Sequence, residues 1–448
     1  MLPFEFASQE FPDELAFDDG LTTVKYGELE TAISESPVMH LDLRPGQHIA
    51  WCPQNDKDAF ITFWALIKRG CVACPINYRF PTLTRQEIVG RIDALWLPDE
   101  IENAKKYQRR HSPTSSTLET DSPATIILSS GSTGTPKAVV HSMQAHIVNA
   151  RGSTRNIPLE PGDRWFWTLP LCHISGLSIL FRCALAAATV VGIQADSKLT
   201  DQLIDQHKIT HLSAVNTQLR RLINEPSFPP KSLRTILLGG SATDPRLVTD
   251  TRERGVTTLT TYGLTEMASQ VATSEPDSIS ESSGEVLEGR EIKITEDNKI
   301  LVRGETLCLG YYSDGTINPV VDKKGWFATG DMGYVDGQNQ LFVKGRIDNL
   351  FISGGENVYP ENIERVMLKI FDIEQVIIAP KPDHEFGERP VAFVNGELPT
   401  DWQAQLRPHL ANYEIPIEAL DWPETRDASI KPNRQWIKSL LLNQTNTG

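Results

Sequence analysis

Residues 128–137 combine hydroxyls, glycines and a single lysine in one short loop, Leu-Ser-Ser-Gly-Ser-Thr-Gly-Thr-Pro-Lys. The apolar run before it predicts a buried strand over 124–128, and an apolar-periodic segment from about His141 predicts a helix. Glycines let backbone N–H groups turn toward an anion, hydroxyls add donors, and Lys137 adds positive charge. The loop therefore suits a polyphosphate. It is not a Walker P-loop, because Pro136 stands where that motif needs its second glycine.

This loop resembles the phosphate loop of the adenylate-forming superfamily, which contains acyl-CoA synthetases, luciferases and peptide-synthetase adenylation domains. The alternative is a flexible Ser/Gly linker, but linkers rarely lie between an apolar strand and a helix with one lysine at the end. The resemblance implies that the loop holds the phosphates of ATP through Ser130, Gly131, Ser132, Thr133, Gly134, Thr135 and Lys137.

A second segment matches the adenine-binding part of the same superfamily. Gly239, Gly240 and Ser241 follow a predicted strand over 234–238. Glycines there allow the backbone to approach a flat ligand closely. A plain tight turn is the alternative, and the resemblance implies that the segment lies along the adenine.

Residues 261–266, Thr-Tyr-Gly-Leu-Thr-Glu, place an aromatic ring, a hydroxyl and a carboxylate close together. Such groups can stack on a base, contact a phosphate and hold Mg²⁺. By resemblance, Tyr262 beside Gly263 stacks on adenine, Thr265 contacts the α-phosphate in a catalytic role, and Glu266 coordinates the metal. A strand end followed by a helix N-cap at Thr265 is a compatible alternative.

Two further motifs, Thr-Gly-Asp at 329–331 and Gly-Arg-Ile-Asp at 345–348, follow in the superfamily's order. A carboxylate at Asp331 can accept hydrogen bonds from both ribose hydroxyls. The resemblance implies that Arg346 lies near the same nucleotide and that Asp348 is the hinge between two domains. An exposed hairpin turn is the alternative for Asp331.

The C-terminal segments complete the set of motifs. By resemblance, Gly354 and Gly355 enter the site after the small domain rotates, and line the tunnel for the pantetheine of coenzyme A. Lys431 resembles the catalytic lysine, which offsets charge developing in the transition state. The sequence departs from the family pattern at Ile430, where glycine is common, and Lys438 is the alternative nearby.

Residues 170–176, Pro-Leu-Cys-His-Ile-Ser-Gly, precede the helix expected to wall the acyl pocket. His173 matches the gating histidine of the superfamily, with a helix-capping histidine as the alternative. Ser175 and Arg182 are candidate substrate-binding residues. Arg182 lies among apolar neighbours, where a charge is costly to bury unless it is paired. Arg182 either forms a structural salt bridge or binds a second carboxylate on the substrate. Its planar guanidinium is well suited to a carboxylate.

His-Ile-Ser-Gly followed by this arginine resembles the o-succinylbenzoate–CoA ligases of menaquinone biosynthesis. The short chain, the segment 261–269 and the pairs Ile430-Lys431 and Arg434-Gln435 agree with that family. The resemblance implies an AMP-forming acid–thiol ligase that uses ATP, Mg²⁺ and coenzyme A on a small aromatic dicarboxylate. The alternatives are a ligase for another aryl or fatty acid, a loader of a carrier protein, and a non-catalytic nucleotide-binding protein.

Composition narrows the class of partners. A net charge of −15 over 448 residues argues against a nucleic-acid surface, which is usually basic. The longest apolar stretch, 177–193, is interrupted by Arg182 and is too short for a comfortable membrane span. No signal peptide is recognisable. Among six cysteines, only Cys71 and Cys74 form C-x-x-C, without the second pair of a zinc site. A cytoplasmic location is the default expectation, and assembly into a homo-oligomer stays open.

Strand-like runs at 168–170, 188–193, 211–215 and 234–238 alternate with helical segments, which predicts an α/β fold with mainly parallel sheets. From about residue 289, hairpin patterns predict antiparallel strands, and the last hundred residues or so form a small α+β unit. The resemblance adds a distorted β-barrel and a mobile C-terminal domain. It sets the boundary at Asp348, with residues 1–347 binding ATP and the acyl group and residues 348–448 carrying the lysine.

Overall fold

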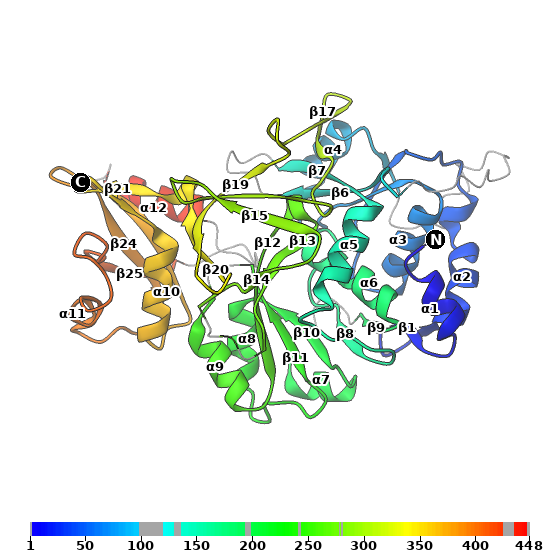
Figure 1. Ribbon diagram of the computed structural model, residues 1–448, viewed down its shortest axis with the longest axis horizontal. Coiled ribbons are helices and arrows are strands. Elements are labelled where there is room, and N and C mark those ends of the chain that lie inside the picture. Colours follow the sequence, from blue (N-terminus) through cyan, green and yellow to red (C-terminus); the bar gives the residue numbers. More distant parts are fainter. Residues whose placement is uncertain are drawn as a thin grey trace.

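The computed structural model describes residues 2–97, 120–129, 136–192, 199–240, 243–276, 278, 281–423 and 434–445. The molecule is elongated, with the N-terminal helices at one end and the segment from β21 onward at the other (Figure 1). The expected mixed α/β architecture is confirmed. Among the described residues, no helix is both long and apolar enough to cross a bilayer.

The larger sheet is mostly parallel. Parallel pairing runs from β12 to β1, and antiparallel strands flank both ends. All four residues of β11 are buried, as expected where helices cover both faces of a sheet. Within the described ranges its order is β14 (Glu285–Val286), β13 (Ser269–Thr273), β12 (Thr257–Leu264), β11 (Thr235–Leu238), β10 (His211–Ala214), β8 (Arg164–Phe166), β9 (Thr189–Val191), β1 (Leu15–Asp18) and β2 (Thr23–Lys25).

The prediction of a strand over 168–170 is wrong, because the strand lies earlier, at β8. Thr168 instead turns its hydroxyl to the carbonyl of Ser213, at 2.8 Å. Pro170 has no N–H to donate to a ladder, so the chain leaves the sheet before it. The other predicted strands of this sheet are present.

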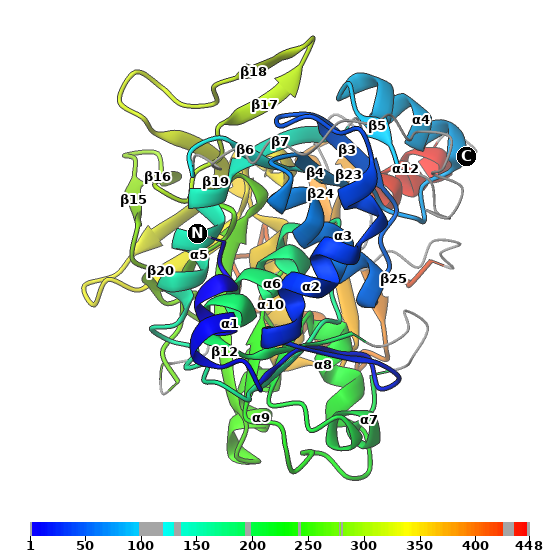
Figure 2. The same cartoon turned by 90° about the vertical axis from the view of Figure 1, so that its right-hand side faces the viewer.

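A second sheet carries the ends of the phosphate loop. Its order over the described residues is β18 (Thr316–Asn318), β17 (Gly310–Ser313), β7 (Lys137–Ser142), β6 (Pro123–Ser129), β4 (Val72–Pro75), β3 (His48–Trp51) and β5 (Leu95–Trp96). β17 and β18 extend from one edge of it (Figures 1 and 2). The loop was expected between a strand and a helix, which is wrong: β6 and β7 pair antiparallel, with Ser129 opposite Lys137. The helix α5 begins only at Met143, after the β-branched run of β7.

Helices cover these sheets: α1 (Glu5–Glu10), α2 (Tyr26–Glu35), α3 (Lys57–Lys68), α4 (Thr82–Arg91), α5 (Met143–Ser153), α6 (Ile174–Ala186), α7 (Asp201–Gln206), α8 (Asn216–Ile223) and α9 (Pro245–Glu253), with short 3₁₀ turns η1 (Pro37–His40), η3 (Thr265–Met267) and η4 (Ile347–Asn349). The helix α6 is nearly all buried and ends at Ala187, whose φ of 54° breaks the helical path. It contributes to the main hydrophobic core with α2, α3 and α5.

The strands of the last third of the chain pair antiparallel, as expected, except that β25 pairs parallel with β24. One sheet contains β15 (Arg290–Ile294), β16 (Lys299–Gly304), β19 (Phe327–Val335) and β20 (Leu341–Arg346). The C-terminal sheet contains β22 (Glu356–Val358), β21 (Phe351–Ser353), β24 (Gly387–Asn395), β23 (Gln375–Asp383) and β25 (Ala419–Asp421), with α10 (Pro360–Ile370), α11 (Trp402–Leu406) and α12 (Arg434–Thr445). Two hydrophobic clusters of described residues draw only on this C-terminal part.

Candidate active site

The hairpin of β6 and β7 fixes both ends of the phosphate loop. The loop residues themselves, Ser130, Gly131, Ser132, Thr133, Gly134 and Thr135, lie outside the described residues. Lys137 is exposed, and its Nζ lies 4.9 Å from the ring centroid of Tyr311 in β17. Lys137, the only cation of the motif, therefore lies over an aromatic ring directly after the loop.

Glycines shape the backbone of the adenine segment. Gly240 has a φ of 91°, a conformation that side chains rarely allow. A Cβ on Gly239 would lie 2.8 Å from Cγ2 of Thr261, so this segment runs close along β12. A Cβ on Gly263 would lie 2.1 Å from the carbonyl oxygen of Ser269, because β13 turns back tightly there. Ser241 lies outside the described residues.

Tyr262, Asp331 and Arg346 form one hydrogen-bonded group. The Tyr262 hydroxyl donates to Oδ2 of Asp331 at 2.6 Å, and Nη1 of Arg346 lies 3.2 Å from Oδ1. Nη2 of Arg346 donates to Asp348 at 3.1 Å. Asp331 is buried within β19, so its assignment to an exposed turn is wrong. Burial raises the pKa of Asp331, against the Tyr262 hydroxyl and the Arg346 charge, which lower it.

Thr265 and Glu266 lie in the 3₁₀ turn η3, directly after β12. The N-cap of this turn is Leu264, so Thr265 is its first residue and not its cap. The Tyr311 hydroxyl donates to Oε1 of Glu266 at 2.8 Å, and the N–H of Cys308 donates to the Glu266 carbonyl at 2.7 Å. Tyr311 thus contacts both the metal candidate and the phosphate-loop lysine.

Two histidines lie behind Thr265. Nε2 of His141 donates to the Thr265 carbonyl at 2.6 Å, so Nε2 carries the proton. Burial lowers the pKa of His141 to about 4. The ring of His146 stacks on Phe181 with centroids 4.7 Å apart. The two histidine rings therefore lie between the turn η3, which is expected to contact the α-phosphate, and the helix α6, which carries Phe181.

His173 and Ser175 begin the helix α6. His173 is the N-cap residue and is exposed, yet its side chain makes no capping hydrogen bond, so the helix-capping interpretation is wrong. Ser175 is half-buried in the first turn. A Cβ on Gly176 would lie 2.2 Å from the Pro170 carbonyl oxygen, so the start of the helix packs tightly on the preceding segment.

Arg182 is 2% exposed on α6. Its Nη2 donates to Oε1 of Gln270 at 2.6 Å, and its Cζ lies 5.3 Å from the ring centroid of Trp165. Among the described residues, no ion pair includes Arg182 and its Nε has no hydrogen-bond partner. The structural salt bridge is therefore absent from the described part of the chain. Burial lowers the pKa of Arg182 to about 10.

A second buried arginine lies beside the first. Nε of Arg290 donates to the Gln270 carbonyl at 2.9 Å, and Nη2 to that of Asn149 at 3.0 Å. Burial, and then the charge of Arg182, lower the pKa of Arg290 to about 9. Gln270 therefore contacts two buried cations, and Arg290 also feels the charge of Glu288. Sequence reasoning missed Gln270, Arg290, Tyr311 and His141.

The C-terminal candidates lie beyond Arg346. Gly354 and Gly355 form the exposed tip of the β21–β22 hairpin, with φ of 61° and 86°. Ile430 and Lys431 lie outside the described residues. Arg434, three residues later, makes a two-pronged ion pair with Glu364 of α10, at 2.6 and 2.8 Å. This pair anchors the helix that follows the lysine segment.

The residues present suit Mg²⁺ bound together with a nucleotide. Within the described ranges, no cluster of three or more His, Cys, Asp or Glu side chains could hold a metal. Mg²⁺ is usually bound by one or two carboxylates together with substrate phosphates. Glu266, half-buried and held by Tyr311, supplies one such carboxylate.

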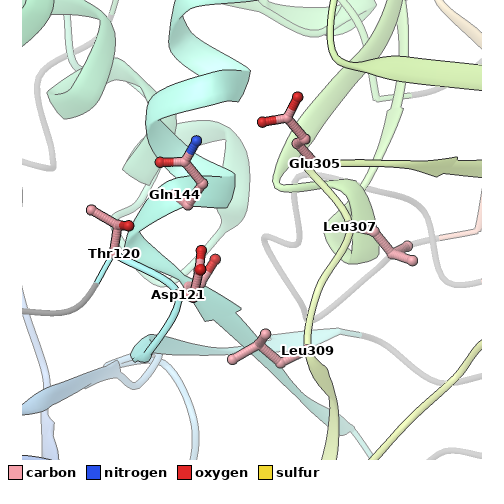
Figure 3. A pocket seen from close by; sticks show the side chains of 7 residues that line it. Thr120, Asp121, Gln144, Glu305, Leu307 and Leu309 are labelled. Atoms are coloured by element: carbon pink, nitrogen blue, oxygen red, sulfur yellow. The ribbon is translucent and has the colours of Figure 1, made fainter.

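A cavity of about 490 Å³ lies elsewhere, between the start of α5 and the segment 305–309. Figure 3 shows Asp121 and Glu305 among the side chains around it. None of the nucleotide or acyl candidates lines it. Two carboxylates do not suit a polyphosphate, so we do not assign this cavity to the active site.

Comparison with known proteins defines the class. The family model described as AMP-binding enzyme matches residues 82–312, and the chain belongs to this family. It is 34% identical to the 2-succinylbenzoate–CoA ligase of Escherichia coli K12, over 88% of this chain and 87% of that protein. It is 33% identical to the corresponding ligase of Haemophilus influenzae, over 98% of each. Within the AMP-binding enzymes, the chain thus belongs with the 2-succinylbenzoate–CoA ligases.

Solved structures agree. The fold is similar to an E. coli MenE variant with bound OSB-AMS, with a TM-score of 0.85, 30% identity and 98% of each chain covered. It is similar to Bacillus subtilis MenE in complex with the acyl-adenylate intermediate OSB-AMP, with a TM-score of 0.84, 28% identity and 97% of each chain covered. The same B. subtilis enzyme with ATP and magnesium ion has a TM-score of 0.83, at 28% identity, over 97% of this chain and 99% of that one.

Proposed function

We propose that the chain ligates 2-succinylbenzoate to coenzyme A in two half-reactions. In the first, an oxygen of the succinyl carboxylate attacks the α-phosphorus of ATP, the bond to the bridging oxygen breaks, and pyrophosphate leaves. In the second, the thiol of coenzyme A loses its proton and attacks the adenylate carbonyl, and AMP leaves. The AMP-binding family and the ligase relatives support this chemistry.

The chain's own residues are proposed to act mainly by positioning and charge stabilisation. Tyr262 stacks on the adenine, and Asp331 accepts from the ribose hydroxyls beside Arg346. Thr265 contacts the α-phosphate. Lys431 offsets negative charge at the reacting phosphorus.

Glu266 would hold Mg²⁺, which neutralises phosphate charge when bound. Ser130 to Lys137 bind the β- and γ-phosphates, and the segment from Gly239 to Ser241 lies along the base. The glycines, the adjacent carboxylate and the lysine over Tyr311 support this arrangement.

We further propose that Asp348 is a hinge between residues 1–347 and 348–448. After adenylation, rotation about it removes Lys431 and brings Gly354 and Gly355 to the coenzyme A tunnel, with His173 as the gate. The separate C-terminal hydrophobic clusters support such a division. A cytoplasmic location is proposed on the six cysteines, all of which are free thiols.

The observation that carries the substrate assignment is Arg182, a buried cation without an anionic partner in the described residues. The ring carboxylate of 2-succinylbenzoate is the anion that this guanidinium lacks. A buried charge pair of this kind favours binding and discriminates against ligands that lack the charge.

The test compares 2-succinylbenzoate with 4-oxo-4-phenylbutanoate, which keeps the succinyl chain but lacks the ring carboxylate. In Arg182→Met, the KM for 2-succinylbenzoate should rise about 100-fold, because a charge partner is lost, while the KM for ATP and for the monoacid stays near wild type. AMP formation with coenzyme A is the readout. Arg155→Met, at a side chain that is 58% exposed, is the control. Unchanged discrimination in Arg182→Met would return Arg182 to a structural role.

A further inference from the structure

Tyr311 is the one side chain that contacts both the phosphate-loop lysine and the carboxylate proposed for the metal, among the contacts of the described residues. Its hydroxyl donates to Oε1 of Glu266 at 2.8 Å, and its ring lies 4.9 Å below Nζ of Lys137. Lys137 begins β7, whereas Glu266 follows β12, in a different sheet. A single half-buried ring thus spans the two elements.

The backbone fixes this ring in place. Tyr311 pairs with Val139 of β7 in an antiparallel ladder, two residues beyond Lys137. Gly310 has a φ of 149°, and a Cβ there would lie 2.3 Å from the Asn318 carbonyl oxygen, so β18 packs closely on β17. The N–H of Cys308 binds the carbonyl of Glu266 itself. The main chain of residues 308–311 is therefore paired both with β7 and with Glu266 itself.

We propose that Tyr311 is a positioning residue for ATP–Mg²⁺, which rests on the roles proposed above for Lys137 and Glu266. A flexible lysine loses rotamer freedom when it binds a phosphate, and a ring beneath it removes part of that freedom beforehand. The hydroxyl donates to Oε1 of Glu266, which would leave Oε2 for the metal that Glu266 is proposed to hold. The two positive charges that meet the phosphates are arranged by one side chain.

Substitutions can separate the two contacts. Tyr311→Phe keeps the ring under Lys137 and removes the hydrogen bond to Glu266. Tyr311→Leu removes both. Tyr312→Phe is the matched control, since the neighbouring hydroxyl in the same strand donates to Asp93 at 2.8 Å instead.

The measurement is ATP binding by calorimetry without the acid substrate, over a range of Mg²⁺ concentrations. Tyr311→Phe should need about tenfold more Mg²⁺ for half-maximal tightening of ATP binding, as for a lost hydrogen bond to a charged group, with Mg²⁺-free binding unchanged. Tyr311→Leu should also weaken Mg²⁺-free binding several-fold. Tyr312→Phe should match wild type in both.

Two results would overturn the proposal: wild-type Mg²⁺ dependence in Tyr311→Phe, or equal shifts in Tyr311→Phe and Tyr312→Phe. Glu266→Gln separates this failure from failure of the proposed site. If Glu266→Gln leaves Mg²⁺ dependence intact, the metal role of Glu266 is wrong. If Glu266→Gln abolishes the Mg²⁺ dependence of ATP binding, adding Tyr311→Phe to that variant should have no further effect on it. Thermal unfolding of each variant checks that it is folded.

Discussion

Some titratable side chains of this protein, the histidines His211 and His141 among them, are buried in their neutral form. His211 is buried at the start of β10, where its ring bonds to the Thr210 hydroxyl and the Pro158 carbonyl, and burial lowers its pKa to about 4. His141 behaves in the same way for the same reason. These rings serve as neutral hydrogen-bond donors, so they are not candidates for proton transfer near neutral pH.

This burial predicts an acid-sensitive fold. The unfolded chain protonates His211 near 6.5, but the folded chain does so only near 4. Between these values the unfolded state binds more protons, so the free energy of unfolding falls as pH drops from about 6.5 to about 4. The loss over the whole interval is about 3 kcal/mol for the residue, of which about 2 kcal/mol falls above pH 5. Urea unfolding at pH 7.5 and 5.0 measures that part.

His211→Asn is the comparison for that measurement, since it removes the titrating ring outside the proposed site. Its stability should depend less on pH over the same interval than that of the wild type. An identical loss in both proteins would assign the acid sensitivity to other groups.

At the scale of elements, the close packing at the start of α6 requires a glycine, Gly176. Gly176→Ala puts a Cβ 2.2 Å from the Pro170 carbonyl and 2.4 Å from that of Leu169. Because His173 and Ser175 lie beside it, we expect the KM for the carboxylate to rise at least several-fold and the Tm to fall. Steady-state kinetics and thermal unfolding measure the two effects.

Gly90 in α4 provides the matched substitution. An added Cβ there meets nothing within 4 Å. Gly90→Ala should raise stability by about 0.5–1 kcal/mol through helix propensity and leave the kinetics unchanged. If Gly176→Ala behaves like Gly90→Ala, tight packing at the start of α6 does not matter for the acyl pocket.

Local sequence signals predicted most elements of the sheets. The glycines and β-branched runs indicate β11, and the alternation around Asp336 indicates the β19–β20 hairpin. The hairpin of β6 and β7 was missed because its loop carries no hairpin turn signal. Only the pairing of Ser129 with Lys137 reveals it.

The site was predictable where chemistry is concentrated in short motifs, as in Tyr262 to Glu266. Gln270 and Tyr311 could not be found in this way. Each is an ordinary residue in a strand, and its role comes from partners 88 and 45 positions away in the chain. Contacts between distant segments leave no local pattern.

At the scale of the whole molecule, the proposed hinge connects two units with separate cores. Asp348 lies in the 3₁₀ turn η4, and its carboxylate receives Nη2 of Arg346. Proline there restricts φ and removes that hydrogen bond as well. Asp348→Pro should lower coenzyme A transfer from supplied adenylate at least 100-fold, while pyrophosphate release stays within a few-fold of wild type.

Asp348→Ala loses the same hydrogen bond but keeps backbone freedom, so it should retain most of both half-reactions. Lys431→Ala should show the opposite pattern to Asp348→Pro, losing adenylation and keeping transfer. Lys438→Ala, on the exposed side of α12, should lose neither. Equal loss of both half-reactions in Asp348→Pro would argue against a hinge at this residue.

The charge of Arg182, which has no ion-pair partner in the described part of the chain, also affects how long the protein survives. Taking a cation out of water without a counter-ion lowers the stability of the empty enzyme, and a bound dicarboxylate returns that stability by mass action. Opening of the fold, and with it cleavage by proteases, should therefore slow when the acid is plentiful. The turnover of the protein would then follow the supply of its own substrate.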